Sequence, residues 1–248
     1  RKVKQYLGML AFSFKKLNWE KWLMVHFKIN KLPNVHIVDR YLDTLSAFDI
    51  KNDKKGLDYF IPDNDKVSLV ELPIGFQNNY VGFVIGAQHS TKKMPIEKIA
   101  EICAKLKLPV ILLGGTEDKD TANEIISKSK LVSGFEKKLI FNSCGKFSIN
   151  QSASLVRQAQ LIISHDTGLM HIAAAFKKKI ISLWGNTIPE FGMYPYFPAE
   201  ASKIFQVDNL KCRPCTKIGF SKCYKKHFDC MNKQDIDGIV RFANQQIS

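Results

Sequence analysis

The chain contains Ser164-His165-Asp166-Thr167-Gly168-Leu169-Met170-His171-Ile172-Ala173-Ala174-Ala175, which places an acid, a hydroxyl and a glycine at one turn. The apolar run Leu161-Ile162-Ile163 before it predicts a buried strand, and the small apolar residues at its end predict a helix. The first free N–H groups of a helix and its dipole favour phosphate. The turn therefore suits a diphosphate-linked donor. Asp-Thr-Gly is also an ordinary N-cap sequence, and His171 alone could be a packed helix residue.

The same alternation extends on both sides of this turn. Strands are expected at 81–86, 110–113, 139–141, 180–183 and 204–207. Helices are expected at 95–106 and 118–129, and Ser148-Ile149-Asn150-Gln151 forms a capping box that opens another. This order predicts an α/β fold with a doubly wound parallel sheet over roughly residues 78–235, whose ligands bind at the carboxyl ends of the strands.

The first 75 residues follow another pattern. Val38, Tyr41, Leu42, Leu45 and Phe48 mark one face of a helix, and an aromatic-rich basic segment from Trp19 to Phe27 precedes it. No convincing sheet is visible, and residues 62–79 are expected to form a linker. We therefore expect residues 1–75 to be the remainder of an N-terminal domain and residues 76–248 to form the C-terminal domain. Because the chain begins with Arg1 rather than Met, it is interpreted as truncated or processed.

Three more loops follow predicted strands. The loop from Gly86 to Pro95 offers hydroxyls and ammonium groups before a helix, although it lacks the P-loop pattern. Gly114-Gly115-Thr116-Glu117-Asp118 puts a carboxylate where ribose hydroxyls are commonly bound. Ser143-Cys144-Gly145 offers backbone groups near a base or sugar. Together these loops favour a nucleotide-type ligand over simple helix capping.

Composition narrows the class of protein. The chain has 248 residues, of which 45% are hydrophobic, enough for a globular protein with one large or two smaller cores. No apolar run approaches the roughly 18 to 20 residues that span a bilayer, and no signal peptide opens the chain. We therefore expect a cytoplasmic protein.

The net charge of +14 is concentrated in two segments. Residues 1–31 carry eight Lys or Arg against Glu20 alone, and residues 211–233 carry seven against Asp229 alone. Two such patches indicate a polyanionic partner: nucleic acid, an acidic membrane or a phosphorylated substrate. The alternative is a solvated lysine-rich face.

Four cysteines fall close together near the end of the chain. Cys212 and Cys215 have the short spacing of zinc ligands, whereas Cys223 and Cys230 do not form a second tight pair. A structural zinc site is one interpretation, and buried or loosely packed thiols are the favoured one. Disulfides are not expected in a cytosolic chain.

Several separate segments of the chain resemble glycosyltransferase family 9, the ADP-heptose:lipopolysaccharide heptosyltransferases. The stretch from Asp166 to His171 is similar to its Asp-Ser/Thr-Gly-x-x-His signature. Further similar segments are Lys92-Lys93-Met94-Pro95, Leu112–Asp118, Cys144-Gly145-Lys146, Leu183–Pro189 with Thr187, Cys212-Arg213-Pro214-Cys215 and Cys230-Met231. The similarity covers the C-terminal two-thirds strongly and residues 1–75 loosely.

The resemblance implies a GT-B architecture, with a Rossmann-like C-terminal donor domain and part of an N-terminal Rossmann-like domain. It implies that Asp166, Thr167, Gly168 and His171 meet the diphosphate and heptose, that Lys92 stabilises the leaving group, and that Glu117 holds the ribose. The segments that are similar to the family also imply four further donor-binding residues: Gly115, Cys144, Gly145 and Thr187. No metal or other cofactor is expected, because Lys92 and the helix N-terminus supply positive charge.

The family's catalytic base is an aspartate early in the N-terminal domain, in a part that this chain does not match. No general base is therefore assigned, and Asp39, Asp43 and Asp49 lie on or near a helix and are poor substitutes. Met94 and Leu169 stand where the family often has Trp and Pro.

The resemblance implies an inverting transfer of heptose from ADP-heptose to an anionic lipopolysaccharide precursor at the cytoplasmic face of the inner membrane, where the protein would be peripheral. Two alternatives stay open: another GT-B enzyme that uses a UDP-sugar, and a basic nucleic-acid-binding module. The second is disfavoured because no helix-turn-helix, RNA-recognition or finger motif is present.

Overall fold

A six-stranded parallel sheet forms the centre of the structure, a computed structural model that describes residues 4–6, 9–11, 15–133 and 139–247. The strand order is β5-β4-β3-β6-β7-β8. The strands are β3 (Val81–Val84), β4 (Val110–Leu113), β5 (Ile140–Asn142), β6 (Leu161–His165), β7 (Lys179–Trp184) and β8 (Lys203–Gln206). The expected doubly wound parallel sheet is confirmed.

The strand order reverses between β3 and β6, the two strands at the centre of the sheet. From β3 the chain first builds outward through β4 to β5, and then returns to β6 and builds the other half. Loops that follow the two central strands therefore diverge to opposite faces and leave a crevice between them, where open α/β sheets bind ligands.

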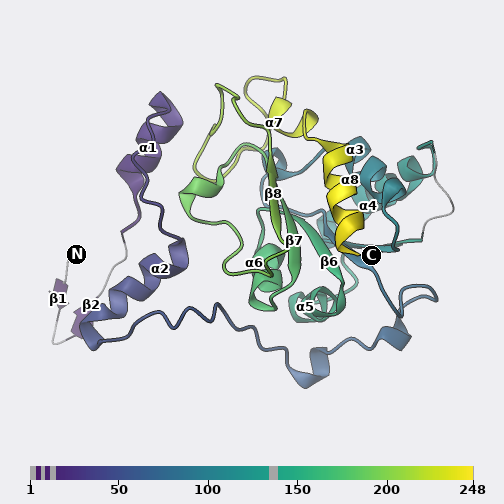
Figure 1. Ribbon diagram of the computed structural model, residues 1–248, viewed down its shortest axis with the longest axis horizontal. Helices are drawn as coiled ribbons and strands as arrows, with labels where there is room; N and C mark the ends of the chain where they lie inside the picture. The colour runs from purple at the N-terminus through teal and green to yellow at the C-terminus, as the bar shows by residue number, and fades with distance from the viewer. Residues whose placement is uncertain (1–3, 7–8, 12–14, 134–138, 248) are drawn as a thin grey trace.

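Helices cover both faces of the sheet (Figure 1). One face packs against α3 (Ile96–Lys105), α4 (Lys119–Ser129) and α8 (Ile236–Gln246). The other packs against α5 (Ile149–Gln158) and α6 (Gly168–Ala175). Side chains alternate along each strand, so that Val110 and Leu112 of β4 enter the first core and Ile111 and Leu113 the second.

Most element boundaries expected from the sequence agree with the structure to within two residues. The Ser148 capping box is present, with the hydroxyl accepting from Gln151 N and the Gln151 side chain accepting from Ser148 N. Pro95 is the N-cap of α3 rather than a residue of its first turn. Short 3-10 turns η4 (Ser90–Lys92), η5 (Thr116–Asp118) and η6 (Pro189–Phe191) lie in the loops after β3, β4 and β7, and α7 (Asp229–Asn232) precedes α8.

The described part of residues 1–75 contains a two-stranded antiparallel hairpin of β1 (Lys4–Tyr6) and β2 (Met9–Ala11). It also contains α1 (Asn18–Phe27), α2 (Ile37–Leu42) and the 3-10 helix η1 (Asp43–Phe48). The expectation of no sheet was thus wrong for this hairpin. Of the basic residues counted in residues 1–31, Arg1 and Lys2 lie outside the described residues.

The single amphipathic helix expected around residues 38–48 was also wrong. After Leu42 the α-helix continues as the 3-10 helix η1. Because a 3-10 helix has about three residues per turn instead of 3.6, the apolar side chains no longer share one face. Tyr41 and Phe48 are 49% and 56% exposed, and the buried residue of α2 is Arg40.

Residues 62–79, expected to be a linker, pack against the second core instead. They contain η2 (Asp63–Asp65) and η3 (Leu69–Glu71), and Val67, Leu72 and Phe76 are all buried beside α5. Ser154 of α5 accepts a hydrogen bond from Val67 N at 3.0 Å. This segment is therefore part of the fold. The division into domains at residues 75 and 76 stays a prediction.

The α1–α2 segment reaches back to loops that follow β7 and β8. Arg40 donates to the carbonyl of Phe191 at 3.1 Å, and Ile37 N donates to that of Gly192 at 2.8 Å. The Lys28 ammonium donates to the carbonyl of Pro214 at 2.7 Å. Throughout the described residues, every helix falls short of the length and apolar character that a membrane span requires.

Candidate functional site

A cavity of about 490 Å³ opens at the carboxyl edge of the sheet, where the strand order reverses. Its walls come from the loops after β3, β4 and β6 and from the start of α5. The lining residues used below are Gly86, Gly115, Glu117, Thr167 and Gly168. The structure therefore brings together four of the residues expected to bind the donor: Gly115, Glu117, Thr167 and Gly168.

The helix α6 begins at this cavity without a side-chain cap. Thr167 occupies the N-cap position but makes no capping hydrogen bond, and its hydroxyl instead lies 3.2 Å from that of Ser164. Asp166 faces the opposite way, toward Lys92. The capping interpretation of Asp-Thr-Gly is therefore wrong, and the positive end of α6 stays available to an anion.

Gly168 keeps the space in front of that helix end open. A Cβ built on Gly168 would meet nothing within 4 Å, whereas one on Gly115 would lie 2.3 Å from the Glu117 carboxylate. The protein's own packing thus does not require a glycine at position 168. The glycine leaves the α6 backbone accessible to a ligand.

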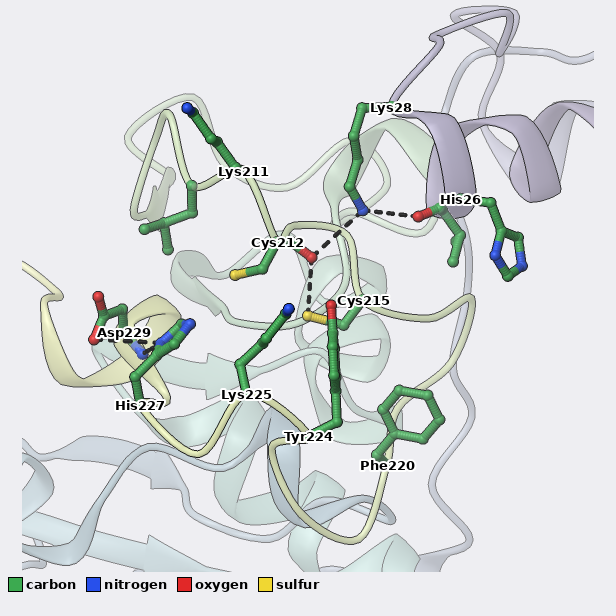
Figure 2. A pocket seen from close by; sticks show the side chains of 12 residues that line it. His26, Lys28, Lys211, Cys212, Cys215, Phe220, Tyr224, Lys225, His227 and Asp229 are labelled. Carbon is green, nitrogen blue, oxygen red and sulfur yellow. Dashed lines mark hydrogen bonds and ion pairs between the residues drawn. The ribbon is translucent and has the colours of Figure 1, made fainter.

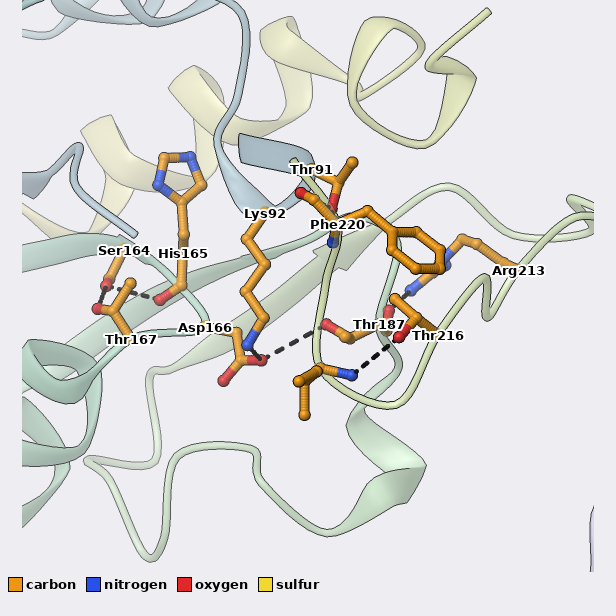
Figure 3. Close-up of polar contacts among 11 residues, drawn as sticks. Thr91, Lys92, Ser164, His165, Asp166, Thr167, Thr187, Arg213, Thr216 and Phe220 are labelled. Atoms are coloured by element: carbon orange, nitrogen blue, oxygen red, sulfur yellow. Dashed lines mark hydrogen bonds and ion pairs between the residues drawn. The ribbon is translucent and has the colours of Figure 1, made fainter. Parts of the chain in front are cut away.

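Beside the helix end, Lys92 and Asp166 form an ion pair that is mostly shielded from water (Figure 3). The Nζ–Oδ2 distance is 2.6 Å, and the side chains are 14% and 8% exposed. The Thr187 hydroxyl lies 3.4 Å from the same carboxylate oxygen, and Arg213 holds the Thr187 carbonyl at 2.8 Å. A lysine ammonium has three N–H donors and Asp166 accepts one, so two can face a phosphate.

Two histidines flank this pair in different ways. The His165 ring is fully buried, and its Nε2 accepts a hydrogen bond from Met94 N at 2.9 Å, which fixes the loop that carries Lys92. Burial lowers the pKa of His165 to about 4. Burial also lowers the pKa of His171, while the nearby Asp166 charge raises it. Both rings are therefore neutral near pH 7.

The adjacent lysine, Lys93, has a separate partner. Its ammonium lies 2.6 Å from the carboxylate of Asp118, which is 1% exposed and also accepts from Gly115 N at 3.1 Å. Lys93 and Asp118 thus fix the glycine loop, whereas Lys92 faces Asp166. The sequence did not predict these separate partners, because two adjacent lysines in a loop give no indication of where each side chain points.

Cys144 and Gly145 lie under the site rather than among the residues that line it. The Cys144 thiol is 1% exposed, and burial raises its pKa to about 12. Gly145 has a φ of +71°, and its N–H donates to the carbonyl of Gly114 at 3.2 Å. A side chain there would lie 2.9 Å from the Thr116 backbone. These two residues support the glycine loop from below.

The four cysteines near the end of the chain have different environments. Cys230 is buried, whereas Cys212, Cys215 and Cys223 are half-exposed, and all six cysteines of the chain are free thiols. Within the described ranges, no group of three or more His, Cys, Asp and Glu side chains is arranged to hold a metal ion. The structure thus gives no support to the zinc interpretation.

The aspartates considered as a general base are engaged or distant. Asp39 accepts hydrogen bonds from Tyr196 and Asn52, each at 2.6 Å. Asp43 begins η1, and Asp49 follows its end with a φ of +56°. None of the three lines the cavity, so no general base is assigned.

The sequence matches a known family over most of its length. The sequence model described as glycosyltransferase family 9 (heptosyltransferase) matches residues 12–225. The chain is 30% identical over 143 residues to lipooligosaccharide heptosyltransferase 2 of Haemophilus influenzae, a match that covers 56% of this chain and 40% of that protein. It is 29% identical over 115 residues to lipopolysaccharide heptosyltransferase 2 of Escherichia coli, covering 45% of this chain and 32% of that protein. The chain thus spans less than half the length of these relatives.

Solved structures share the fold. The E. coli ADP-heptose lipopolysaccharide heptosyltransferase II superposes with a TM-score of 0.56 at 20% identity, over 77% of this chain and 54% of that one. A family 9 glycosyl transferase from Veillonella parvula superposes with a TM-score of 0.57 at 22% identity, over 71% of this chain and 50% of that one.

Proposed function

The chain belongs to glycosyltransferase family 9, and from this membership we propose that it binds ADP-heptose for transfer of the heptose to a lipopolysaccharide core precursor. The names of its relatives support the heptose and the lipopolysaccharide acceptor, and the name of a solved structure with this fold contains ADP-heptose. The observation that carries the proposal is the uncapped start of α6, which faces a cavity through Gly168 and lies beside the Lys92–Asp166 pair. That combination suits a diphosphate.

In the proposed reaction an acceptor hydroxyl attacks the anomeric carbon of the heptose. The bond from that carbon to the diphosphate oxygen breaks, ADP leaves, and the configuration inverts. Negative charge grows on the leaving diphosphate, and the Lys92 ammonium and the N–H groups of α6 stabilise it. Asp166 accepts a hydrogen bond from the Lys92 ammonium, and the Thr187 hydroxyl donates one to Asp166, so both residues act through Lys92.

The remaining donor contacts follow from position. Glu117 is exposed on the cavity wall, where its carboxylate can accept hydrogen bonds from the ribose hydroxyls. His171 lies one helical turn after Gly168, and its neutral ring can donate a hydrogen bond to the sugar or the diphosphate. The Lys92 ammonium and the N–H groups at the start of α6 already supply positive charge. We therefore propose that transfer needs no metal and that activity persists in EDTA.

Binding of ADP tests the proposal on the chain as it stands. Calorimetry should detect ADP binding, and Lys92→Ala and Asp166→Asn should each weaken it at least tenfold at a temperature where circular dichroism shows both variants still folded. Lys107→Ala is the matched control, because this exposed lysine precedes β4 at the opposite edge of the sheet. Unchanged ADP affinity in both site variants would contradict the assignment.

Two further titrations test the alternatives. UDP in place of ADP should bind much more weakly, and tighter binding of UDP would favour a UDP-sugar enzyme instead. Salt-dependent binding of RNA or DNA without any binding of ADP would favour the nucleic-acid-binding module.

We also infer peripheral contact with the cytoplasmic face of an anionic membrane. The stacked rings of Trp19 and Trp22 and the ring of Phe27 project from α1 with 64%, 37% and 59% exposure. Exposed aromatic rings among lysines favour a lipid–water interface. Vesicles containing phosphatidylglycerol should blue-shift the tryptophan fluorescence at low salt. Trp19→Ser/Trp22→Ser should abolish the shift, because Trp184 is buried.

A further inference from the structure

A second pocket, of about 690 Å³, lies where the end of α1 meets the loop after β8 (Figure 2). We call it the basic pocket, and define it by Lys28 of the α1 end and by Lys211, Phe220, Tyr224, Lys225 and His227 of that loop. The two lysine-rich segments seen in the sequence therefore meet at one concave surface.

Among the described residues, the lysines of this pocket lack carboxylate partners, whereas His227 Nδ1 lies 3.4 Å from the carboxylate of Asp229. Across the described residues, Lys211 and Lys225 form no ion pair, and Lys28 donates only to carbonyl oxygens, those of Val25, Cys212 and Pro214. The acidic residue on the wall, Asp229, is already paired with Lys233 at 2.6 Å. Three uncompensated cations around one hollow favour a bound anion.

Aromatic rings beside these cations narrow the kind of anion. Phe220 and Tyr224 are 42% and 53% exposed, and their ring centroids lie 6.4 Å apart in an edge-on arrangement. Lys225 lies over the Tyr224 ring, 5.4 Å from its centroid. Exposed ring faces offer apolar surface to the C–H face of a sugar, while the ammonium groups bind an oxyanion.

The wall of the basic pocket is joined to the loop that carries Lys92 (Figure 3). Thr91 N donates to the carbonyl of Phe220 at 3.1 Å, and Phe220 N donates to the Thr91 hydroxyl at 2.8 Å. Thr91 is 3% exposed and directly precedes Lys92. The wall of the basic pocket is therefore hydrogen-bonded to the residue that directly precedes Lys92.

We propose that the basic pocket binds a sugar-borne oxyanion, phosphate or carboxylate, of the acceptor and so seats the acceptor beside the donor cavity. This inference rests on the proposed transferase function, and it names the acceptor subsite. Lys211 and Lys225 would contact the oxyanion, Tyr224 and Phe220 would contact the sugar, and Lys28 would supply charge while it joins α1 to the loop.

The test measures binding of small probes in the presence of saturating ADP, which occupies the donor cavity. The probes are glucose 6-phosphate, glucuronate and glucose, and the readout is the shift of backbone amide NMR signals of residues 210–229. The phosphate and the acid should bind, each at least tenfold more tightly than glucose. The tighter of the two identifies the kind of oxyanion.

Variants then locate the binding. Lys211→Ala/Lys225→Ala should weaken binding of the charged probes at least tenfold. Both side chains are exposed, so its melting temperature should stay unchanged. Lys222→Ala/Lys226→Ala is the matched control, since it removes two charges at exposed positions of the same loop outside the pocket and should bind like the parent.

The outcomes separate this proposal from the proposed function. Unchanged probe binding in the double variant, or equal binding of glucose, would overturn the pocket assignment while ADP binding stands. Absence of ADP binding in the parent chain would overturn the transferase function whatever the probes do. Loss of phosphatidylglycerol vesicle binding in the double variant, without binding of either charged sugar, would overturn the acceptor subsite in favour of a lipid site.

Discussion

Two residues of the site, Thr167 and Gly168, make no contact that the fold itself needs. Gly168 leaves space that no neighbour fills, and Thr167 leaves the start of α6 uncapped. His165 differs from them, because its buried ring accepts a hydrogen bond from Met94 N and so fixes the loop of the site from within the core. Two predictions distinguish these roles.

Gly168→Ala should separate ligand binding from stability. The added methyl meets no protein atom, and alanine is favoured over glycine inside a helix by up to about 1 kcal/mol. The melting temperature should therefore stay the same or rise. Binding of ADP should weaken at least tenfold, because the methyl occupies the approach to the backbone. A variant that binds ADP like the parent would show that the diphosphate lies elsewhere.

The buried His165 should make the protein sensitive to mild acid. Its pKa is lowered from 6.5 to about 4 in the fold, so below pH 6.5 the unfolded chain takes up a proton that the folded chain does not. The free energy of unfolding should therefore fall as the pH drops from 6.5 toward 4, by about 2 kcal/mol at pH 5.

Urea unfolding at pH 7 and pH 5 measures this loss. In His165→Gln the difference between the two pH values should shrink by about the same amount, because glutamine does not titrate. Some pH dependence should persist, since burial also lowers the pKa of His36 and His171. An unchanged difference in the variant would mean that His165 is not the sensitive group.

Elements were predictable from the sequence where local chemistry and periodicity agreed. The apolar strands β4 and β6 and the Ser148 capping box of α5 were all predicted, because burial on both faces and a Ser-x-x-Gln pair leave clear signals. Four loops of the site were predicted to share one sheet edge. Three features were not predicted: the opposite partners of Lys92 and Lys93, the buried supporting position of Cys144, and the change from α2 to η1. They depend on contacts between segments that are distant in the sequence.

The capping box of α5 gives a prediction at the scale of an element. Ser148→Ala should lower the free energy of unfolding by about 1 kcal/mol, because the Gln151 N–H loses its acceptor. Urea unfolding measures the change. Ser148→Thr keeps the hydroxyl and should lie within a few tenths of a kcal/mol of the parent, so an equal loss in both variants would argue against the cap.

The molecule as a whole has a well-packed sheet region and an N-terminal α1–α2 segment attached to it by polar contacts and by the packing of the His36 ring on Tyr194 and Tyr196. No residue of α1 is buried, and α2 buries Arg40 rather than an apolar side chain. The strands β3, β4 and β6, by contrast, are buried along nearly their whole length. Elements with few apolar contacts open at a lower free energy than the core does.

Arg40→Ala should loosen the N-terminal segment without unfolding the sheet. The guanidinium donates to the carbonyls of Phe191 and Lys15, and both bonds are lost in the variant. Hydrogen exchange should show faster exchange for amides of α1 and α2 and unchanged protection in β3, β4 and β6. Lys31→Ala, which removes an exposed charge from the same segment, is the control. Equal loss of protection in the sheet would show that the two regions open together.

The hydrogen bond from Lys28 to Pro214, 186 positions later in the chain, also bears on the order of events during synthesis. The ribosome releases α1, with its exposed tryptophans, long before it makes the loop that α1 contacts. The aromatic helix must therefore wait while some 180 residues follow, at about 5–20 residues per second, which is on the order of ten seconds or more. During that interval the contact of Lys28 with the Pro214 carbonyl cannot form, so α1 can complete its attachment to this loop only near the end of synthesis.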